Sequence, residues 1–121
     1  MGGEVARLKT DWLMADIAGA LGELDSAVAT YEEVRRSFVA LGHSQEVAMV
    51  TLDLARLLWK PTPLRARQEA LSVWPILDSL GVSRDAREAK LLAEVVETGN
   101  EVALVELSTA LRCSTLARRR A

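Results

Sequence analysis

The sequence predicts an all-α fold, an array of about three stacked helical hairpins built from about six helices. The segment Leu-Gly-His-Ser at 41–44 returns as Leu-Gly-Val-Ser at 80–83, and an acidic residue follows each copy at the same distance. The other breaks, at Gly22, Pro61 and Asn100, are spaced by 39 residues, the interval that also separates the two segments. The alternating apolar and polar runs that are typical of strands are absent from the sequence.

The first hairpin is predicted from a helix at about Val5–Leu21, a turn at 22–25 and a second helix that ends at Leu41. Gly42 can adopt the left-handed conformation that ends a helix, and Ser44 is expected to cap the next helix. The apolar stripe of the first helix consists of Leu8, Trp12, Ala15, Ala18 and Leu21. The stripe of the second helix consists of Ala27, Tyr31, Val34, Phe38 and Leu41.

The second hairpin is predicted from helices at about Ser44–Trp59 and Leu64–Leu80, separated by a turn with two prolines. The first of these helices has the stripe Val47, Val50, Leu54, Leu57 and Leu58. Pro75 lies inside the other, where a proline costs roughly 3 kcal/mol and kinks a helix. Two shorter helices are therefore an alternative. One kinked helix is favoured because the stripe keeps its phase across the proline, at Leu71, Trp74, Leu77 and Leu80.

The third hairpin is predicted from a helix at about Ser83–Glu97 and a sixth helix at about Glu101–Cys113. The inward side of the fifth helix is expected to hold Ala86, Ala89, Leu92 or Ala93, and Val96. The sixth helix carries Leu104, Leu107 and Leu111. We expect residues 1–3 to be a leader or a remnant of expression, residues 4–113 to be the helical repeat domain, and residues 114–121 to be a basic tail.

Composition argues against several classes of function. A chain of 121 residues suits one domain, and its net charge of −2 does not mark a nucleic-acid-binding protein. Its one cysteine, Cys113, excludes an intrachain disulfide and a cysteine-based zinc site, and it fits the reducing cytoplasm. No apolar run approaches about 18 residues, so no membrane span is expected. We expect neither a cofactor nor a metal.

The sequence offers no convincing catalytic site. His43, the only histidine, follows a helix-ending glycine, where a solvated side chain is favoured over a catalytic base. Ser44 or Ser83 could complete a Ser-His-Asp set, but no nucleophile elbow or phosphate-binding loop accompanies them. A solvated surface is likewise favoured for Glu32-Glu33, a half-buried thiol for Cys113, and a solubilising tail over nucleic-acid or membrane contact for Arg118-Arg119-Arg120.

Residues 15–34 resemble a tetratricopeptide repeat (TPR). The resemblance is carried by Ala15, Gly22-Glu23-Leu24-Asp25, Ala27, Tyr31 and Val34. Val34 replaces a smaller residue, and Pro61-Thr62-Pro63 replaces the glycine and acid of the next turn. From Trp12 to Leu111 the chain also resembles the C-terminal end of bacterial multi-repeat proteins of this superfamily, through Phe38, Leu41-Gly42, Leu52-Asp53-Leu54-Ala55, Trp74-Pro75-Ile76-Leu77, Leu80-Gly81-Val82 and Ala86. The resemblance implies an α-solenoid, no cofactor and the binding of other proteins.

In solenoids of this type the first helix of each pair lines the concave surface. Carried over to this chain, that surface would hold Lys9, Asp16, Arg56, Trp59, Lys60, Arg87, Lys90 and Glu94. This mixture predicts a protein or peptide ligand with acidic character, and a solvated charged face is the alternative. Trp12 and Trp74 are expected in the core, whereas Trp59 is the tryptophan expected to be exposed.

The predicted function is that of a non-catalytic protein–protein interaction module, a fragment of a larger bacterial protein. The alternative is a self-associating scaffold whose partner is a second copy, giving a homo-oligomer through the terminal helices. The first helix holds more apolar residues than one face can bury, namely Val5, Leu8, Trp12, Leu13, Met14 and Ile17. The last helix has the same excess, with Val102, Leu104, Val105, Leu107 and Leu111. An enzyme is not expected.

Overall fold

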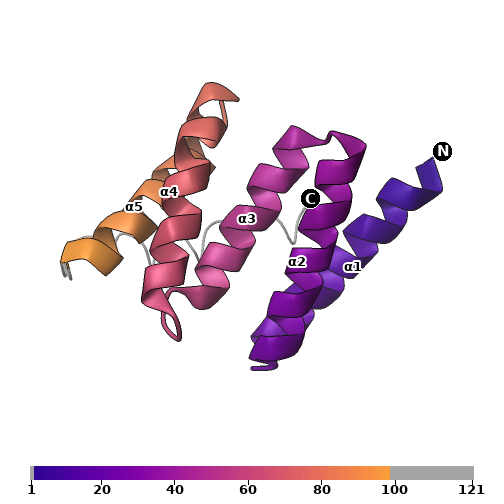
Figure 1. Ribbon diagram of the computed structural model, residues 1–121, viewed down its shortest axis with the longest axis horizontal. Coiled ribbons are helices and arrows are strands. Elements are labelled where there is room, and N and C mark those ends of the chain that lie inside the picture. Colours follow the sequence, from indigo (N-terminus) through magenta and orange to yellow (C-terminus); the bar gives the residue numbers. More distant parts are fainter. Residues whose placement is uncertain (1, 99–121) are drawn as a thin grey trace.

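The computed structural model describes residues 2–98, which form five α-helices and contain no strand (Figure 1). The helices are α1 (Gly2–Ala20), α2 (Leu24–Leu41), α3 (Ser44–Leu58), α4 (Pro63–Ser79) and α5 (Ser83–Thr98). The predicted all-α class is thereby confirmed. The predicted turn at Asn100, the sixth helix at 101–113, Cys113 and the tail at 114–121 lie outside the described residues.

Three helices end at glycines in the left-handed conformation, with φ of 80° at Gly22, 74° at Gly42 and 78° at Gly81. At each end the glycine N–H donates to the carbonyl three residues earlier at 3.1 Å. The next N–H donates to the carbonyl five residues before it at 2.9 to 3.0 Å. Two orphan carbonyls of each helix are satisfied in this way. The predicted equivalence of the ends at Gly42 and Gly81 is therefore confirmed.

The starts of the helices differ in part from the prediction. Ser44 does not cap α3, because His43 occupies the cap position and no side chain there bonds a backbone N–H. Glu46 lies in the first turn of α3. The first helix begins at Gly2, earlier than the predicted Val5, and α4 begins at Pro63, where a missing N–H costs no helical hydrogen bond.

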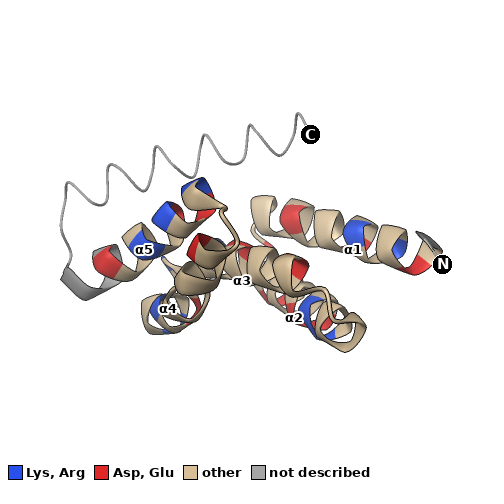
Figure 2. Cartoon of the chain, turned by 90° about the horizontal axis from the view of Figure 1, so that it is seen from above, with Lys and Arg blue, Asp and Glu red and all other residues tan. Residues whose placement is uncertain are grey.

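Each helix packs against the next one along the chain, and α3 also contacts both α1 and α5. Seen from above, α1 and α5 lie on one side of the row and α2 and α4 on the other, with α3 between them (Figure 2). One apolar cluster joins α1, α2 and α3 around Phe38 and Leu54, and a second joins α3, α4 and α5 around Leu52 and Leu92. Because α3 contributes to both clusters, it is buried on most of its surface.

The predicted apolar stripes are correct for α2 and wrong for most of α4. In α2 the first four predicted residues are buried, and only Leu41 is exposed. The helix α4 is continuous through Pro75, as favoured from the sequence, but Leu71 and Leu80 are exposed and Trp74 is half-buried. The residues that α4 buries are Ala66, Ala70, Val73 and Leu77. Two of these four residues are alanines, and Leu71 lies outside the buried face.

The stripes of the other helices are correct in part. In α1, Leu8 and Ala15 are buried, Trp12 and Ala18 are half-buried, and Leu21 follows the helix and is exposed. In α3, Val50, Leu54 and Leu58 are buried and Val47 and Leu57 are half-buried. The described part of the α5 stripe is buried, comprising Ala86, Ala89, Leu92 and Ala93, and the side chain of Val96 lies outside the described residues.

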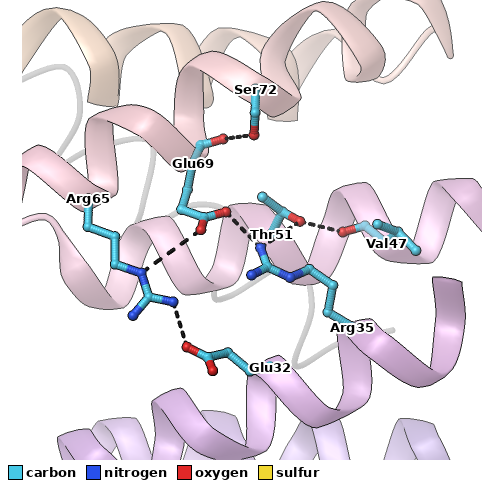
Figure 3. A network of polar contacts seen from close by, with 7 residues as sticks. All are labelled: Glu32, Arg35, Val47, Thr51, Arg65, Glu69 and Ser72. Carbon is cyan, nitrogen blue, oxygen red and sulfur yellow. Dashed lines mark hydrogen bonds and ion pairs between the residues drawn. The ribbon is translucent and has the colours of Figure 1, made fainter.

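A polar network connects α2 to α4 across one face of α3 (Figure 3). Arg35 of α2 donates to Glu69 of α4 at 2.7 Å and to the Thr51 hydroxyl of α3 at 3.4 Å. Arg65 of α4 donates to Glu32 of α2 at 2.5 Å, and its Nε lies 4.0 Å from Glu69. We call these five residues the α2–α4 network. It joins helices that are separated by α3 in the chain.

Candidate functional site

A pocket of about 480 Å³ opens between α1 and α3, and Tyr31 of α2 also lines it. We call it the α1–α3 pocket. The two helices approach closely at Gly19, where a Cβ atom would lie 3.1 Å from Cδ1 of Leu57. The side chains on which its chemistry depends are Leu13, Asp16, Ile17, Asp53, Arg56 and Leu57.

The rim of the α1–α3 pocket is apolar. Leu13 and Ile17 of α1 are 58% and 45% exposed, and Leu21, which follows α1, is 70% exposed. Met14, their neighbour on α1, is also exposed. Exposed apolar side chains are common when scattered singly, but a contiguous group at a pocket is typical of a binding surface.

The floor of the pocket is polar, and its side chains form hydrogen bonds that involve α1, α2 and α3. The indole Nε1 of Trp12 donates to Oδ2 of Asp53 at 2.6 Å, and the Tyr31 hydroxyl donates to Oδ1 of Asp16. Asp53 also accepts from Nη1 of Arg56 through its other oxygen, Oδ1. Asp53 is buried, although it carries a carboxylate, and these donors compensate for its loss of hydration.

Arg56 continues this network into α5. Its Nε donates to Oε2 of Glu88, which is fully buried, and its Nη2 lies 3.7 Å from Oδ1 of Asp85. We call Asp53, Arg56, Asp85 and Glu88 the α3–α5 charge cluster. It contains three carboxylates and one guanidinium, so its formal charge is −2.

The protonation of Arg56 is fixed by this cluster. Burial by itself lowers the pKa of Arg56, but the charges of Asp53 and Glu88, the hydrogen bond to Glu88 and the charge of Asp85 outweigh it and raise the pKa above its ordinary value. Arg56 is therefore a permanent cation whose charge is engaged inside the protein. This arrangement differs from the expectation of an arginine that presents its charge to an acidic ligand.

Of the residues predicted for the concave surface, the structure brings only Asp16 and Arg56 to the α1–α3 pocket. Trp59, which was expected to be exposed, is half-buried and packs against both apolar clusters. Lys60 lies beside it, with Nζ 5.2 Å from the centre of the Trp59 ring. Trp59 occupies this place because it follows the last residue of α3, where the two clusters meet.

The predicted residues of α5 lie apart from the pocket. Arg87, Lys90 and Glu94 are exposed, and Nζ of Lys90 is 5.6 Å from the centre of the Trp74 ring on α4. Trp12 and Trp74, which were expected in the core, are half-buried. Trp12 lies at the core boundary because its indole nitrogen reaches Asp53, and Trp74 lies on the side of α4 that faces Lys90.

Asp53, Asp85 and Glu88 were missed as site residues by sequence reasoning. One signal was present, because Asp53 interrupts the apolar run Leu52-Asp53-Leu54 in the most apolar helix. Glu88 also falls between the predicted inward positions Ala86 and Ala89 of α5. A charged residue on a buried stripe usually has a partner, and Arg56, three residues after Asp53, was available.

A second pocket, of about 380 Å³, lies at the turn between α2 and α3 and includes His43 and Ser44. His43 Nδ1 is 3.7 Å from Glu46, and its ring centre is 6.0 Å from that of Phe38. Between residues 2 and 98, no three His, Cys, Asp or Glu side chains are placed to hold a metal ion. None of the helices in this same range combines the length and the apolar character that a membrane span requires.

Comparisons with protein-family models, curated proteins and solved structures give no match to this chain.

Proposed function

We propose that the chain is a non-catalytic protein–protein interaction module, an α-solenoid of TPR-like hairpins in which the α1–α3 pocket binds a partner protein. The solenoid reading is supported by the packing of each helix on the next and by the matching helix ends at Gly22, Gly42 and Gly81. The single cysteine is the reason for placing this module in a reducing compartment such as the cytoplasm.

The observation that carries the proposal is the apolar rim of the α1–α3 pocket. Leu13, Ile17 and Leu21 are exposed beside a concave surface that also contains Leu57. Covering apolar surface contributes roughly 25 cal/mol per Å², so a partner that covers this rim gains affinity from it. A partner that covers the rim would turn it into a desolvated centre of the interface. Interaction energy concentrates in such centres rather than in the surrounding polar contacts.

The test uses the full chain as bait in cells and then in a titration with the purified protein that it captures. Leu13→Asp places a charge on the rim and should weaken binding of that protein at least about tenfold, which corresponds to about 1.4 kcal/mol. Leu64→Asp is the matched control, since Leu64 is 75% exposed at the start of α4, away from the pocket. Equal affinities of the two variants, both folded by circular dichroism, would overturn the assignment of the pocket.

A self-associating scaffold is the second candidate, and the same exposed face favours it. Leu13, Met14 and Ile17 on α1 form an apolar face that a second copy could cover. The corresponding residues of the predicted sixth helix lie outside the described residues.

A further inference from the structure

We propose that the chain's own C-terminal segment, residues 99–121, covers the α1–α3 pocket, and that a partner protein or a second copy must displace this segment to bind there. The segment follows α5 and lies outside the described residues. The cover itself is independent of the proposed function, whereas the competition with a partner rests on it, because both concern the same pocket.

The apolar rim of the pocket can receive a helix. Leu13, Ile17 and Leu21 follow one another at intervals of four residues, so they form one row along α1 and its end. All three are exposed, and Leu57 lines the pocket from α3. Rows of side chains spaced by four residues are the ridges against which a second helix packs. The rim therefore suits a helix with an apolar stripe of its own.

The C-terminal segment carries such a stripe. Residues 101–113 are predicted from the sequence to be helical, and Leu104, Leu107 and Leu111 recur there at spacings of three and four residues. Thr109 falls on the opposite side of the same predicted helix. A contiguous apolar stripe is covered in most soluble proteins, so these leucines need a surface against which to pack.

The segment begins close enough to reach the pocket. The helix α5 ends at Thr98, and it lies on the same side of the row as α1 (Figure 2). Because α3 contacts both of these helices, α5 and α1 are separated by two interhelical spacings of about 8–10 Å each. A helix over residues 101–113 would be about 20 Å long, at 1.5 Å per residue. It could therefore extend from the end of α5 across α3 to the rim.

The exposed apolar residues of α4 are less suitable for covering by one helix. Leu71 and Ile76 are five residues apart, so they project from α4 in directions that differ by about 140°. One docked helix cannot cover both of them, whereas the row on α1 presents its side chains in one direction. Tethering adds to this preference, because a segment joined to α5 by a short linker meets the pocket at an effective concentration on the order of mM.

Cross-linking of the full chain tests where the segment lies. Cys113 is the only cysteine, so a benzophenone maleimide attaches to the wild-type protein at one position. After illumination of a dilute sample, mass spectrometry should find cross-links within one chain to α1 or to the part of α3 that lines the pocket. The absence of such cross-links overturns the inference, whether the label reacts with α4, as the predicted third hairpin would allow, with a second chain or not at all.

A fluorescent peptide tests whether the segment fills the pocket. The probe is a synthetic peptide of residues 99–121 with a fluorophore on Cys113. Leu107→Asp interrupts the stripe of the tethered segment, so this variant should bind the peptide at least about tenfold more tightly than the wild type does. Thr109→Asp is the matched control and should bind it as weakly as the wild type. Adding Leu13→Asp to Leu107→Asp should remove the gain, because the rim is then charged.

The outcomes separate this inference from the proposed function. Equal affinities of the wild type and Leu107→Asp for the peptide, with both folded by circular dichroism, would overturn the cover. If the cover fails while Leu13→Asp still weakens binding of the captured protein, the proposed function stands. If the cover is found but Leu107→Asp does not bind the captured protein severalfold more tightly than the wild type, the competition is wrong and that protein binds elsewhere.

Discussion

The indole Nε1 of Trp12 in α1 donates a hydrogen bond at 2.6 Å to Oδ2 of Asp53 in α3, a residue 41 positions away. Because Asp53 also binds Arg56, and Arg56 binds Glu88, one set of polar contacts connects α1, α3 and α5. Apolar packing tolerates small rotations of a helix, whereas hydrogen bonds between specific atoms do not. The relative orientation of these three helices is therefore set in part by a buried polar network.

Removing the cation of the α3–α5 charge cluster should strongly destabilise the protein. Arg56→Met keeps much of the side-chain volume but removes the guanidinium that pairs with both Asp53 and the fully buried Glu88. Breaking a buried ion pair in this way costs roughly 3–5 kcal/mol. Urea denaturation should show this loss in the free energy of unfolding. Arg87→Met, at an exposed position on α5, is the control and should change it by no more than about 0.5 kcal/mol.

The glycines that end α2 and α4 should each resist substitution. Gly42 and Gly81 have φ of 74° and 78°, where a Cβ atom strains the backbone although nothing lies within 4 Å of it. Gly42→Ala and Gly81→Ala should each lower the free energy of unfolding by about 1–2 kcal/mol. Gly3→Ala is the control, because Gly3 is helical in α1 and a Cβ there also meets open space. A loss at Gly3 equal to that at Gly42 would contradict this explanation.

The buried face of α4 can be tested by two leucines of the same helix. Leu77 is fully buried among residues of α3 and α5, whereas Leu71 is 40% exposed. Leu77→Ala should cost roughly 2–5 kcal/mol of stability, because it leaves a cavity. Leu71→Ala should cost well under half of that. Equal losses on urea denaturation would restore the face predicted from the sequence, on which both leucines are buried.

The buried faces of some helices could be predicted from the sequence, and those of others could not. The stripe of α2 was predictable because Tyr31 and Phe38 are large apolar residues at helical spacing. The face of α4 was not, because it is formed partly by Ala66 and Ala70, which weigh less in an apolar pattern than the exposed Leu71. Helix ends at glycine were predictable because they depend on local backbone conformation alone.

The candidate site was harder to predict than the fold. Asp16 and Arg56 were expected on one surface, and they do line one pocket. The charge state of that pocket depends on Glu88, which is 32 residues from Arg56 and reaches it only because α5 packs on α3. Helical periodicity gives the face of each helix but not the pairing of residues across two helices. The pairing of Arg56 with Glu88 was therefore not predictable from the sequence.

The α2–α4 network should make stability depend on pH at its exposed end. The hydrogen bond from Arg65 lowers the pKa of Glu32 below its ordinary value of 4.5; burial opposes this effect, and the charges of Arg65, Arg35 and Arg36 add to it. The unfolded chain then binds a proton at Glu32 more readily than the folded chain does. The contribution of Glu32 to stability is therefore complete above the unfolded value and is lost as the pH falls through the lower, folded value.

Urea midpoints measured from neutral to acidic pH test this linkage. The stability difference between the wild type and Glu32→Gln should shrink as the pH falls below about 4.5. Arg65→Gln removes the main cause of the shift and should reduce the same component of the pH dependence. A difference between the wild type and Glu32→Gln that is constant over this range would contradict the role given to Arg65.

The exposed face of α1 should make the full chain self-associate when no other partner is present. Leu13, Met14 and Ile17 are all exposed on this helix, and contiguous apolar surface is covered in most proteins by another domain or a second copy. Closed association of identical chains favours a twofold dimer in which the same face is used twice. Sedimentation at increasing concentration should therefore show a monomer–dimer equilibrium. Ile17→Asp should shift it toward the monomer, whereas Leu64→Asp, which charges an exposed leucine of α4, should not. A wild-type chain that stays monomeric at high concentration would rule out self-association and leave this face to a different protein.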